Sequence, residues 1–288
     1  MPGPGTDVHE IVAEALGQPV VDVQPLGGGC VSAVYGLRLA DGKRVVAKVD
    51  EAVEGNLPVE AFMLRYLADR SPLPVPTVRF ISSRLLVMDY VDGGSSFNER
   101  AEEHAAELLA GLHNLSASGY GFECDTLIGG LSQPNLWSQS WLSFFAEQRL
   151  VYMAVEARRS GRLPAGLLAR VERFAGDLAR WLIEPACSSL IHGDVWTTNV
   201  LARDGRVTAF LDPAIYFADA EMELAFIGLF GTFGRAFYAR YHELRPIVPG
   251  FFEERRDLYN LYPLLVHTRL FGGSYVGQVE RLLVRFGY

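Results

Sequence analysis

The segment from His192 to Asn199, followed by Asp212, carries the side chains of this chain best suited to chemistry. It supplies a carboxylate at Asp194, an amide at Asn199 and a second carboxylate at Asp212. Transfer of a phosphoryl group requires a divalent metal on the phosphates and an acceptor hydroxyl held in line. An aspartate can accept the hydroxyl proton, and the oxygen atoms of Asn and Asp suit Mg²⁺. The spacing therefore predicts a kinase-type site with Asp194 as base and Asn199 and Asp212 as metal ligands.

The elements around this segment should position its side chains on loops. A short apolar run precedes His192, and apolar residues over 200–202 and 207–211 flank the turn-forming pair Asp204-Gly205. This pattern predicts a β-hairpin directly after the segment. A strand end followed by a capped helix is the other interpretation of the spacing taken alone. The order of loop, hairpin and second aspartate favours the catalytic interpretation.

The N-terminal third contains residues suited to binding a nucleotide. Three glycines at 27–29 precede an alternating apolar run over 31–39, and a tight turn leads into a second strand that carries Lys48. Glycine lets backbone N–H groups approach phosphate closely, and a lysine on the returning strand can reach the phosphates. We therefore predict phosphate contacts from Gly28, Gly29 and Lys48. An ordinary turn is the alternative, because the pattern is neither a Walker sequence nor a full G-x-G-x-x-G.

A helix is expected after this strand. Apolar residues recur at helical spacing between residues 57 and 68, and Glu60 lies beside them. Glu60 could pair with Lys48 and hold it over the nucleotide. Glu54 is the competing candidate, although it precedes the helix, and a solvated glutamate is the alternative without a function.

Composition argues against several classes of partner. A chain of 288 residues with a net charge of −8 does not resemble a nucleic-acid binder or a polybasic membrane anchor. No apolar run approaches the ~20 residues of a membrane span, and the first residues lack the features of a signal peptide. Three scattered cysteines do not suggest a disulfide or zinc framework. We therefore expect a cytoplasmic protein without nucleic-acid or membrane partners.

The pattern of the chain changes near residue 92. Strands and one helix are expected before it, and almost only helices after it, apart from the hairpin near the catalytic segment. We expect an α+β fold with a nucleotide-binding lobe over 1–91 and a catalytic, substrate-binding lobe over 92–288. A nucleotide between the lobes would meet four hinge residues, Met88, Asp89, Tyr90 and Val91.

The residues described so far resemble those of the fructosamine kinase (ketosamine-3-kinase) family, within the aminoglycoside phosphotransferase and choline kinase group. The broad group is indicated by Lys48, Glu60, His192-Gly193-Asp194, Asn199 and Asp212. The narrower resemblance depends on Gly27–Cys30, Ile128–Asn135, Trp141 with Phe144-Phe145, Trp196, Phe230–Phe233 and the tail from Phe251 to Tyr275. It covers the chain from about Val20 to the end. At Ala220–Leu224 the chain departs from the family, whose members commonly have Arg-Glu-x-Asp-Leu.

The resemblance implies a two-lobed, protein-kinase-like fold and ATP-dependent phosphorylation of the third-carbon hydroxyl of ketosamines. Ketosamines are sugar adducts of free or protein-bound amines, so the activity would repair glycated material. ATP and Mg²⁺ are the implied cofactors. A kinase of another amino alcohol or aminoglycoside, or a non-catalytic ATP-binding module, remains an alternative, and the sequence leaves a monomer or a homodimer open.

Three single residues can each be interpreted in two ways, as functional or as structural. Trp196, next to the predicted base, could stack on a sugar or pack in the core. His267 could contact the substrate or be a core histidine. Cys30, in the glycine-rich segment, could be a redox switch or simply a small apolar residue.

Overall fold

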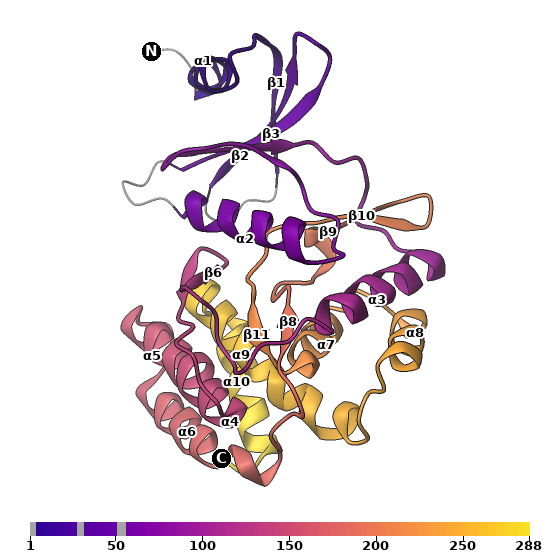
Figure 1. Ribbon diagram of the computed structural model, residues 1–288. Coiled ribbons are helices and arrows are strands. Elements are labelled where there is room, and N and C mark those ends of the chain that lie inside the picture. The colour runs from indigo at the N-terminus through magenta and orange to yellow at the C-terminus, as the bar shows by residue number, and fades with distance from the viewer. Residues whose placement is uncertain (1–3, 28–31, 51–55) are drawn as a thin grey trace.

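The N-terminal part of the molecule is built on an antiparallel sheet. The structure is a computed structural model that describes residues 4–27, 32–50 and 56–288. Helix α1 (Pro4–Leu16) packs against a five-stranded sheet of order β1-β2-β3-β5-β4 (Figure 1). The strands are β1 (Val20–Leu26), β2 (Ala33–Leu39), β3 (Arg44–Val49), β4 (Val78–Ile81) and β5 (Leu85–Asp89). The tight turn between β2 and β3 contains Gly42, whose φ of 84° suits glycine.

Helix α2 (Leu57–Arg70) lies between this sheet and the rest of the molecule (Figure 1). The apolar spacing predicted for it is confirmed, because Leu57, Ala61 and Leu64 are buried against Leu86 and Met88 of β5. Met63 and Leu67 of the same helix belong to the larger core of the C-terminal part, so α2 packs against both parts of the molecule.

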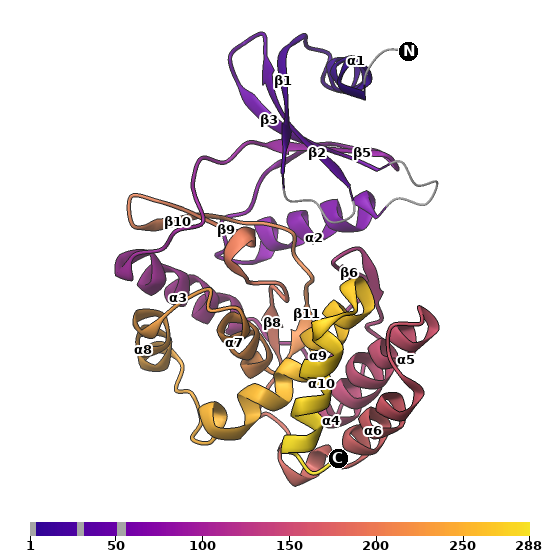
Figure 2. The ribbon, with the colours of Figure 1, turned by 180° about the vertical axis from the view of Figure 1, so that it is seen from behind.

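The C-terminal part is mainly helical and holds the larger hydrophobic core. Its α-helices are α3 (Glu99–His113), α4 (Trp141–Phe144), α5 (Tyr152–Arg159), α6 (Ala165–Gly176), α7 (Ala220–Leu229), α8 (Arg235–Leu244), α9 (Arg256–Phe271) and α10 (Ser274–Arg285). Helix α9 packs against α5, α7 and α10, and Figure 2 shows α9 and α10 side by side near the chain end. Two π-helical turns, η1 (Phe145–Val151) and η4 (Phe251–Arg255), adjoin α4 and α9. Short 3₁₀ turns lie at η2 (Leu178–Arg180) and η3 (Thr197–Asn199).

Three strand pairs interrupt these helices. The predicted hairpin is confirmed as β9 (Val200–Arg203) and β10 (Arg206–Phe210), with Asp204 and Gly205 in the turn at φ of 54° and 74°. The expectation of helices elsewhere in this part was wrong for two further pairs. They are β6 (Thr126–Ile128) with β7 (Leu131–Gln133), and β8 (Ser189–Ile191) with β11 (Tyr216–Ala218). Strands of three residues are too short to show a periodicity of two.

The expected α+β, protein-kinase-like class is thus confirmed. The expected boundary at residues 91 and 92 falls in the segment that joins β5 to α3. Within this segment Asp92 pairs with Arg44 of β3, and Gly94 pairs with Ala202 of β9. The segment therefore contacts both parts of the molecule. Among the described helices, none combines the length and the apolar character that crossing a bilayer requires.

Candidate active site

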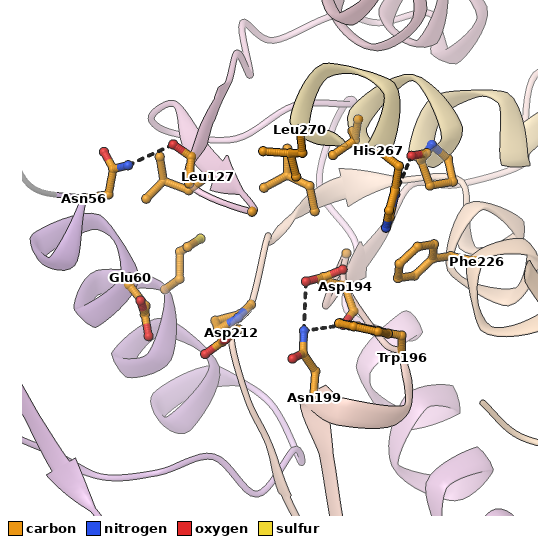
Figure 3. A pocket seen from close by; sticks show the side chains of 18 of the residues that line it. Asn56, Glu60, Leu127, Asp194, Trp196, Asn199, Asp212, Phe226, His267 and Leu270 are labelled. Carbon is orange, nitrogen blue, oxygen red and sulfur yellow. Dashed lines mark hydrogen bonds between the residues drawn. The ribbon is translucent and has the colours of Figure 1, made fainter. Parts of the chain in front are cut away.

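A cavity of about 190 Å³ lies where α2 and β3 face the C-terminal part. Figure 3 shows it from close by, with Glu60 on one side and His267 on another. Side chains far apart in the sequence meet in its wall. Seven of the predicted site residues line it, namely Lys48, Glu60, Asp194, Trp196, Asn199, Asp212 and His267.

The loop that carries Asp194 has its shape because of one glycine. Gly193 has a φ of 85°, and a Cβ atom built on it would lie 2.3 Å from the backbone oxygen of Ala214. The N–H of Ala214 donates to the carbonyl of His192 at 2.7 Å, so the two strands of backbone lie very close together. A residue with a side chain would force them apart, which explains why glycine precedes Asp194.

Asn199 fixes the orientation of the Asp194 carboxylate. The Asn199 Nδ2 group donates to Asp194 Oδ2 at 2.8 Å and to the Asp194 carbonyl at 3.1 Å (Figure 3). The surrounding protein raises the pKa of Asp194 to about 8, chiefly by burial and also through the nearby Asp212 carboxylate, while the Asn199 hydrogen bond opposes the rise. A carboxylate with a raised pKa accepts a proton more readily than an ordinary one. The geometry and the electrostatics therefore suit Asp194 to the role of a base.

Lys48 forms ion pairs with two carboxylates. Its Nζ lies 2.7 Å from Glu60 Oε1 and 2.5 Å from Asp212 Oδ1. The pairing with Glu60 predicted from the sequence is confirmed. Burial alone would lower the pKa of Lys48, but the two carboxylates outweigh it and raise the pKa. The lysine therefore stays a cation that can meet phosphate.

Asn199 and Asp212 offer the oxygen atoms that a hard divalent cation needs. The Asn199 amide nitrogen is already engaged, which leaves its oxygen as the available atom. Asp212 lies just after β10 with a φ of 52°, in a left-handed conformation that Asp tolerates better than most residues. No group of three His, Cys, Asp or Glu side chains able to hold a metal occurs among residues 4–27, 32–50 and 56–288. A pair of protein oxygen ligands fits Mg²⁺, whose remaining ligands are commonly waters and substrate phosphates.

Sequence reasoning missed a buried network behind the loop. Glu223 on α7 accepts hydrogen bonds from the N–H groups of His192 at 3.1 Å and Gly193 at 2.6 Å. His113 of α3 also lies 2.9 Å from Glu223 through its Nε2. Burial opposes ionisation of Glu223, but these hydrogen bonds lower its pKa overall, so it is an ionised anchor for the loop. The departure from the family pattern at Ala220–Leu224 marked this position, but only the fold reveals the contact with His113.

Glu221 lies in the same segment and keeps the residue of the family pattern. It pairs with Arg255 of η4 through two hydrogen bonds of 2.6 and 2.7 Å. This ion pair joins α7 to the start of the α9 segment.

Comparison with known proteins decides the family. The family model described as fructosamine kinase matches residues 5–286. A probable ketoamine kinase from Synechocystis is 33% identical over 98% of this chain and 96% of its own length. A chloroplastic protein-ribulosamine 3-kinase from Oryza sativa subsp. indica is 30% identical over 92% of this chain and 78% of its own. The chain belongs to the fructosamine kinase family.

Solved structures agree with this assignment. A candidate fructosamine-3-kinase from Thermobifida fusca superposes with a TM-score of 0.83 at 32% identity, covering 96% of this chain and 98% of that one. An aminoglycoside phosphotransferase shares the fold, with a TM-score of 0.68 at 19% identity over 98% of this chain and 99% of its own. As a fructosamine kinase family member, the protein is an ATP-dependent phosphotransferase.

In this fructosamine kinase family member, aromatic side chains form one wall of the cavity beside Asp194. Trp196, Phe226 and His267 line it. Phe230 is not a lining residue but packs against two of them, with its ring centroid 5.9 Å from that of Trp196 and 5.0 Å from that of His267. His267 Nδ1 lies 2.7 Å from the carbonyl of Pro263, and burial lowers the pKa of this histidine. A neutral imidazole with Nδ1–H donating to that carbonyl leaves Nε2 free to accept a hydrogen bond. Figure 3 shows His267 and Phe226 facing the space above Asp194.

Not every predicted residue of this kinase reaches the cavity. The hinge residues Met88, Asp89, Tyr90 and Val91 are absent from its lining. The N–H of Asp89 donates to Thr77 and that of Tyr90 donates to Arg44, so neither is free in this structure. Nucleotide contacts by the hinge stay a prediction. Gly28, Gly29 and Cys30, and the competing Glu54, lie outside the described residues.

Proposed function

We propose that this protein transfers the γ-phosphoryl group of ATP to the third-carbon hydroxyl of ketosamines, either free or on glycated proteins. The observation that carries the proposal is the meeting of a base, an oriented amide and a lysine–carboxylate pair in one cavity with an aromatic wall. The names of relatives, ketoamine kinase and ribulosamine 3-kinase, support the choice of substrate. A cytoplasmic location, where ATP is available, is part of the proposal.

Each residue of the site has a proposed role. Asp194 accepts the proton of the substrate hydroxyl, and Asn199 holds that carboxylate in place by its hydrogen bond. Lys48 binds the phosphates while Glu60 positions it. Asn199 and Asp212 hold Mg²⁺, which neutralises charge on the phosphates when bound.

The remaining nucleotide contacts are proposed on the sequence pattern. Backbone groups of Gly28 and Gly29 approach the phosphates, and the hinge residues 88–91 approach the adenine ring of ATP. In this arrangement residues 1–91 act as the nucleotide-binding lobe, and residues 92–288 carry the catalytic and substrate groups.

The aromatic wall suits the amine of a ketosamine. A glycated amine is a cation at neutral pH, and aromatic faces attract cations within about 6 Å of the ring centroid. Trp196 and His267 contact the substrate in this proposal, with Trp196 offering a face and His267 a hydrogen-bond acceptor. The net charge of −8 also favours a cationic substrate.

Replacing Asp194 by Asn tests the proposed base. Turnover of fructosyl-lysine and ribulosyl-lysine should fall roughly 10²–10⁴-fold, because the amide cannot accept the proton. MgATP affinity, measured by calorimetry, should change little. Asp204→Asn is the matched control, because Asp204 lies in an exposed turn of the adjacent hairpin and should leave turnover unchanged. Turnover by Asp194→Asn equal to that of the unmodified protein would contradict the role of Asp194.

A substrate panel tests the reaction itself. ADP release should occur with ketosamines and be much weaker with choline, homoserine and aminoglycosides. Inactivity on every ketosamine together with activity on an amino alcohol would favour the second candidate, which the shared aminoglycoside phosphotransferase fold suggests. MgATP binding without turnover of any compound would favour a non-catalytic module.

A further inference from the structure

The side of the cavity that α9 forms reaches the surface of the molecule at Phe271. Among the large apolar side chains that are exposed in the described part of the chain, only Phe271 lines the cavity, with 52% of its surface exposed. Two other aromatic lining residues, Phe226 and Tyr262, are 5% and 4% exposed. Ligand pockets are commonly lined by aromatic side chains, and a half-exposed one lies at the edge of its pocket. Phe271 therefore marks the place where the cavity opens to solvent.

Phe271 belongs to a cluster of aromatic rings. Its ring centroid lies 5.7 Å from that of His267 and 6.1 Å from that of Tyr275. The centroids of His267 and Tyr275 lie 4.9 Å apart. His267 in turn faces the space above Asp194 (Figure 3). The cluster thus leads from the proposed base to the opening of the cavity.

The side of the cavity formed by α9 carries no charge. Its lining residues are Tyr262, Pro263, Val266, His267, Leu270 and Phe271. Burial lowers the pKa of His267, so this side chain is neutral at pH 7. Figure 3 shows Leu270 and His267 on one side of the cavity, with Asp194 and Asp212 on the other. Phosphates and metal belong to the charged side in the proposed reaction, which leaves the α9 side for an apolar part of the substrate.

The backbone at Phe271 is held in place. Phe271 is the last residue of α9, and Gly272, with a φ of 65°, ends the helix. The guanidinium group of Arg162 donates to the carbonyls of Arg269 and Leu270 in the last turn. A surface that is ordered before a ligand arrives loses little conformational entropy on binding. The end of α9 is therefore ready to receive a ligand without rearrangement.

We propose that the Phe271 ring packs against the apolar stem of the amine that carries the sugar, so that the protein prefers adducts of the lysine side chain to adducts of short amines. The inference rests on the proposed function, which places the acceptor hydroxyl at Asp194 and the amine beside His267. The substituent of the amine then continues past His267 to the opening. The methylene stem of a lysine packs readily along apolar surface, while its backbone stays in water.

A series of ketosamines that differ only in the amine tests this contact. One sugar is carried by methylamine, propylamine, hexylamine or the side chain of Nα-acetyl-lysine amide. On the unmodified protein we expect kcat/KM to rise about 3- to 10-fold from the methylamine adduct to the lysine adduct, because each methylene that leaves water stabilises the complex. In Phe271→Ala this rise should largely disappear. The loss should lie in KM, with kcat nearly unchanged, because the stem is remote from the reacting atoms.

Two further variants separate this contact from a disturbance of the fold. Phe271→Leu keeps an apolar side chain and should retain most of the rise. Phe252→Ala removes an aromatic side chain of η4 that is 43% exposed but does not line the cavity, so it should retain the whole rise. The methylamine adduct is an internal control, because it is too short to reach Phe271. Its kcat/KM should be nearly the same for every variant.

Three results would overturn the inference while leaving the proposed function intact. The unmodified protein could show no dependence on the length of the amine. Phe271→Ala could show the same rise as the unmodified protein. It could also lose activity equally on all adducts, the methylamine adduct included, which would mean that Phe271 supports the fold of the site and does not contact the stem. Inactivity of the unmodified protein on every ketosamine would instead overturn the proposed function, and this inference with it.

Discussion

At the scale of single residues, the site depends on backbone geometry as much as on side-chain chemistry. Gly193 and Asp212 both have a positive φ, and both line the cavity. The first allows the loop to pass close to Ala214, and the second turns its carboxylate toward Lys48. A positive φ costs conformational free energy for residues other than glycine, so it persists only where the surrounding structure holds the backbone in place. Such positions concentrate at functional sites.

Gly193→Ala should therefore destabilise the protein and reduce turnover. The positive φ alone costs on the order of 1–3 kcal/mol for a residue with a side chain, and the contact with Ala214 adds to it. Urea unfolding would measure the loss of stability. Gly166→Ala in α6 is the control, because no atom lies within 4 Å of the added Cβ and its φ is not positive. Equal stability of Gly193→Ala and the control would contradict this account of the loop.

At the scale of elements, the β6–β7 hairpin joins the two parts of the molecule. Asn56, at the start of α2, donates through Nδ2 to the carbonyl of Gly130 at 2.9 Å. On its other side the hairpin meets α9, where a Cβ on Gly129 would lie 2.9 Å from Leu270. The hairpin thus connects the helix that carries Glu60 with the helix that carries His267.

Asn56→Ala should reduce turnover more than its effect on stability would suggest. It removes one hydrogen bond, worth about 1 kcal/mol, and loosens the position of Glu60 one turn further along α2. We expect a two- to tenfold fall in kcat, measured with saturating MgATP. Asn98→Ala is the matched control, because Asn98 caps α3 but does not join the two parts. It should lower the melting temperature without changing kcat, and an equal fall in kcat for both variants would contradict the connecting role.

Prediction from sequence succeeded where the signal is local. The turn at Asp204-Gly205, the helical face of α2 and the spacing from Asp194 to Asn199 each depend on residues close in sequence. The contact of Glu223 with His113 and the stacking of Arg149 on Tyr216 join residues that lie far apart in the chain. Such contacts are decided by how helices pack, and no local periodicity records them.

At the scale of the whole molecule, stability should depend on the protonation of Asp219, which caps α7. Asp219 accepts from the N–H of Glu221 at 3.0 Å and from the Tyr259 hydroxyl at 2.6 Å. Burial, with a smaller contribution from Glu221, raises its pKa from 3.8 to about 6. Between these values the unfolded chain loses the proton while the folded protein keeps it. The free energy of unfolding should therefore fall as pH rises through this window.

Asp219→Asn should remove this part of the pH dependence. The amide can still accept from Glu221 and does not titrate, so the variant should gain stability relative to the unmodified protein as pH rises from about 4 to about 6. Above about pH 7 the difference in the free energy of unfolding between the variant and the unmodified protein should be constant. Thermal unfolding at closely spaced pH values would measure it, and parallel curves for the two proteins would be evidence against the raised pKa.

Lys48 pairs with both Glu60 and Asp212, and this has a consequence for the order in which ligands bind. Before any nucleotide binds, the ammonium group already occupies one oxygen of Asp212, so a bare divalent ion would approach a carboxylate whose charge is partly cancelled. Phosphates entering together with the metal would draw the ammonium toward themselves and release that oxygen at the same moment. The metal should consequently enter as its complex with ATP and associate only weakly with the empty protein.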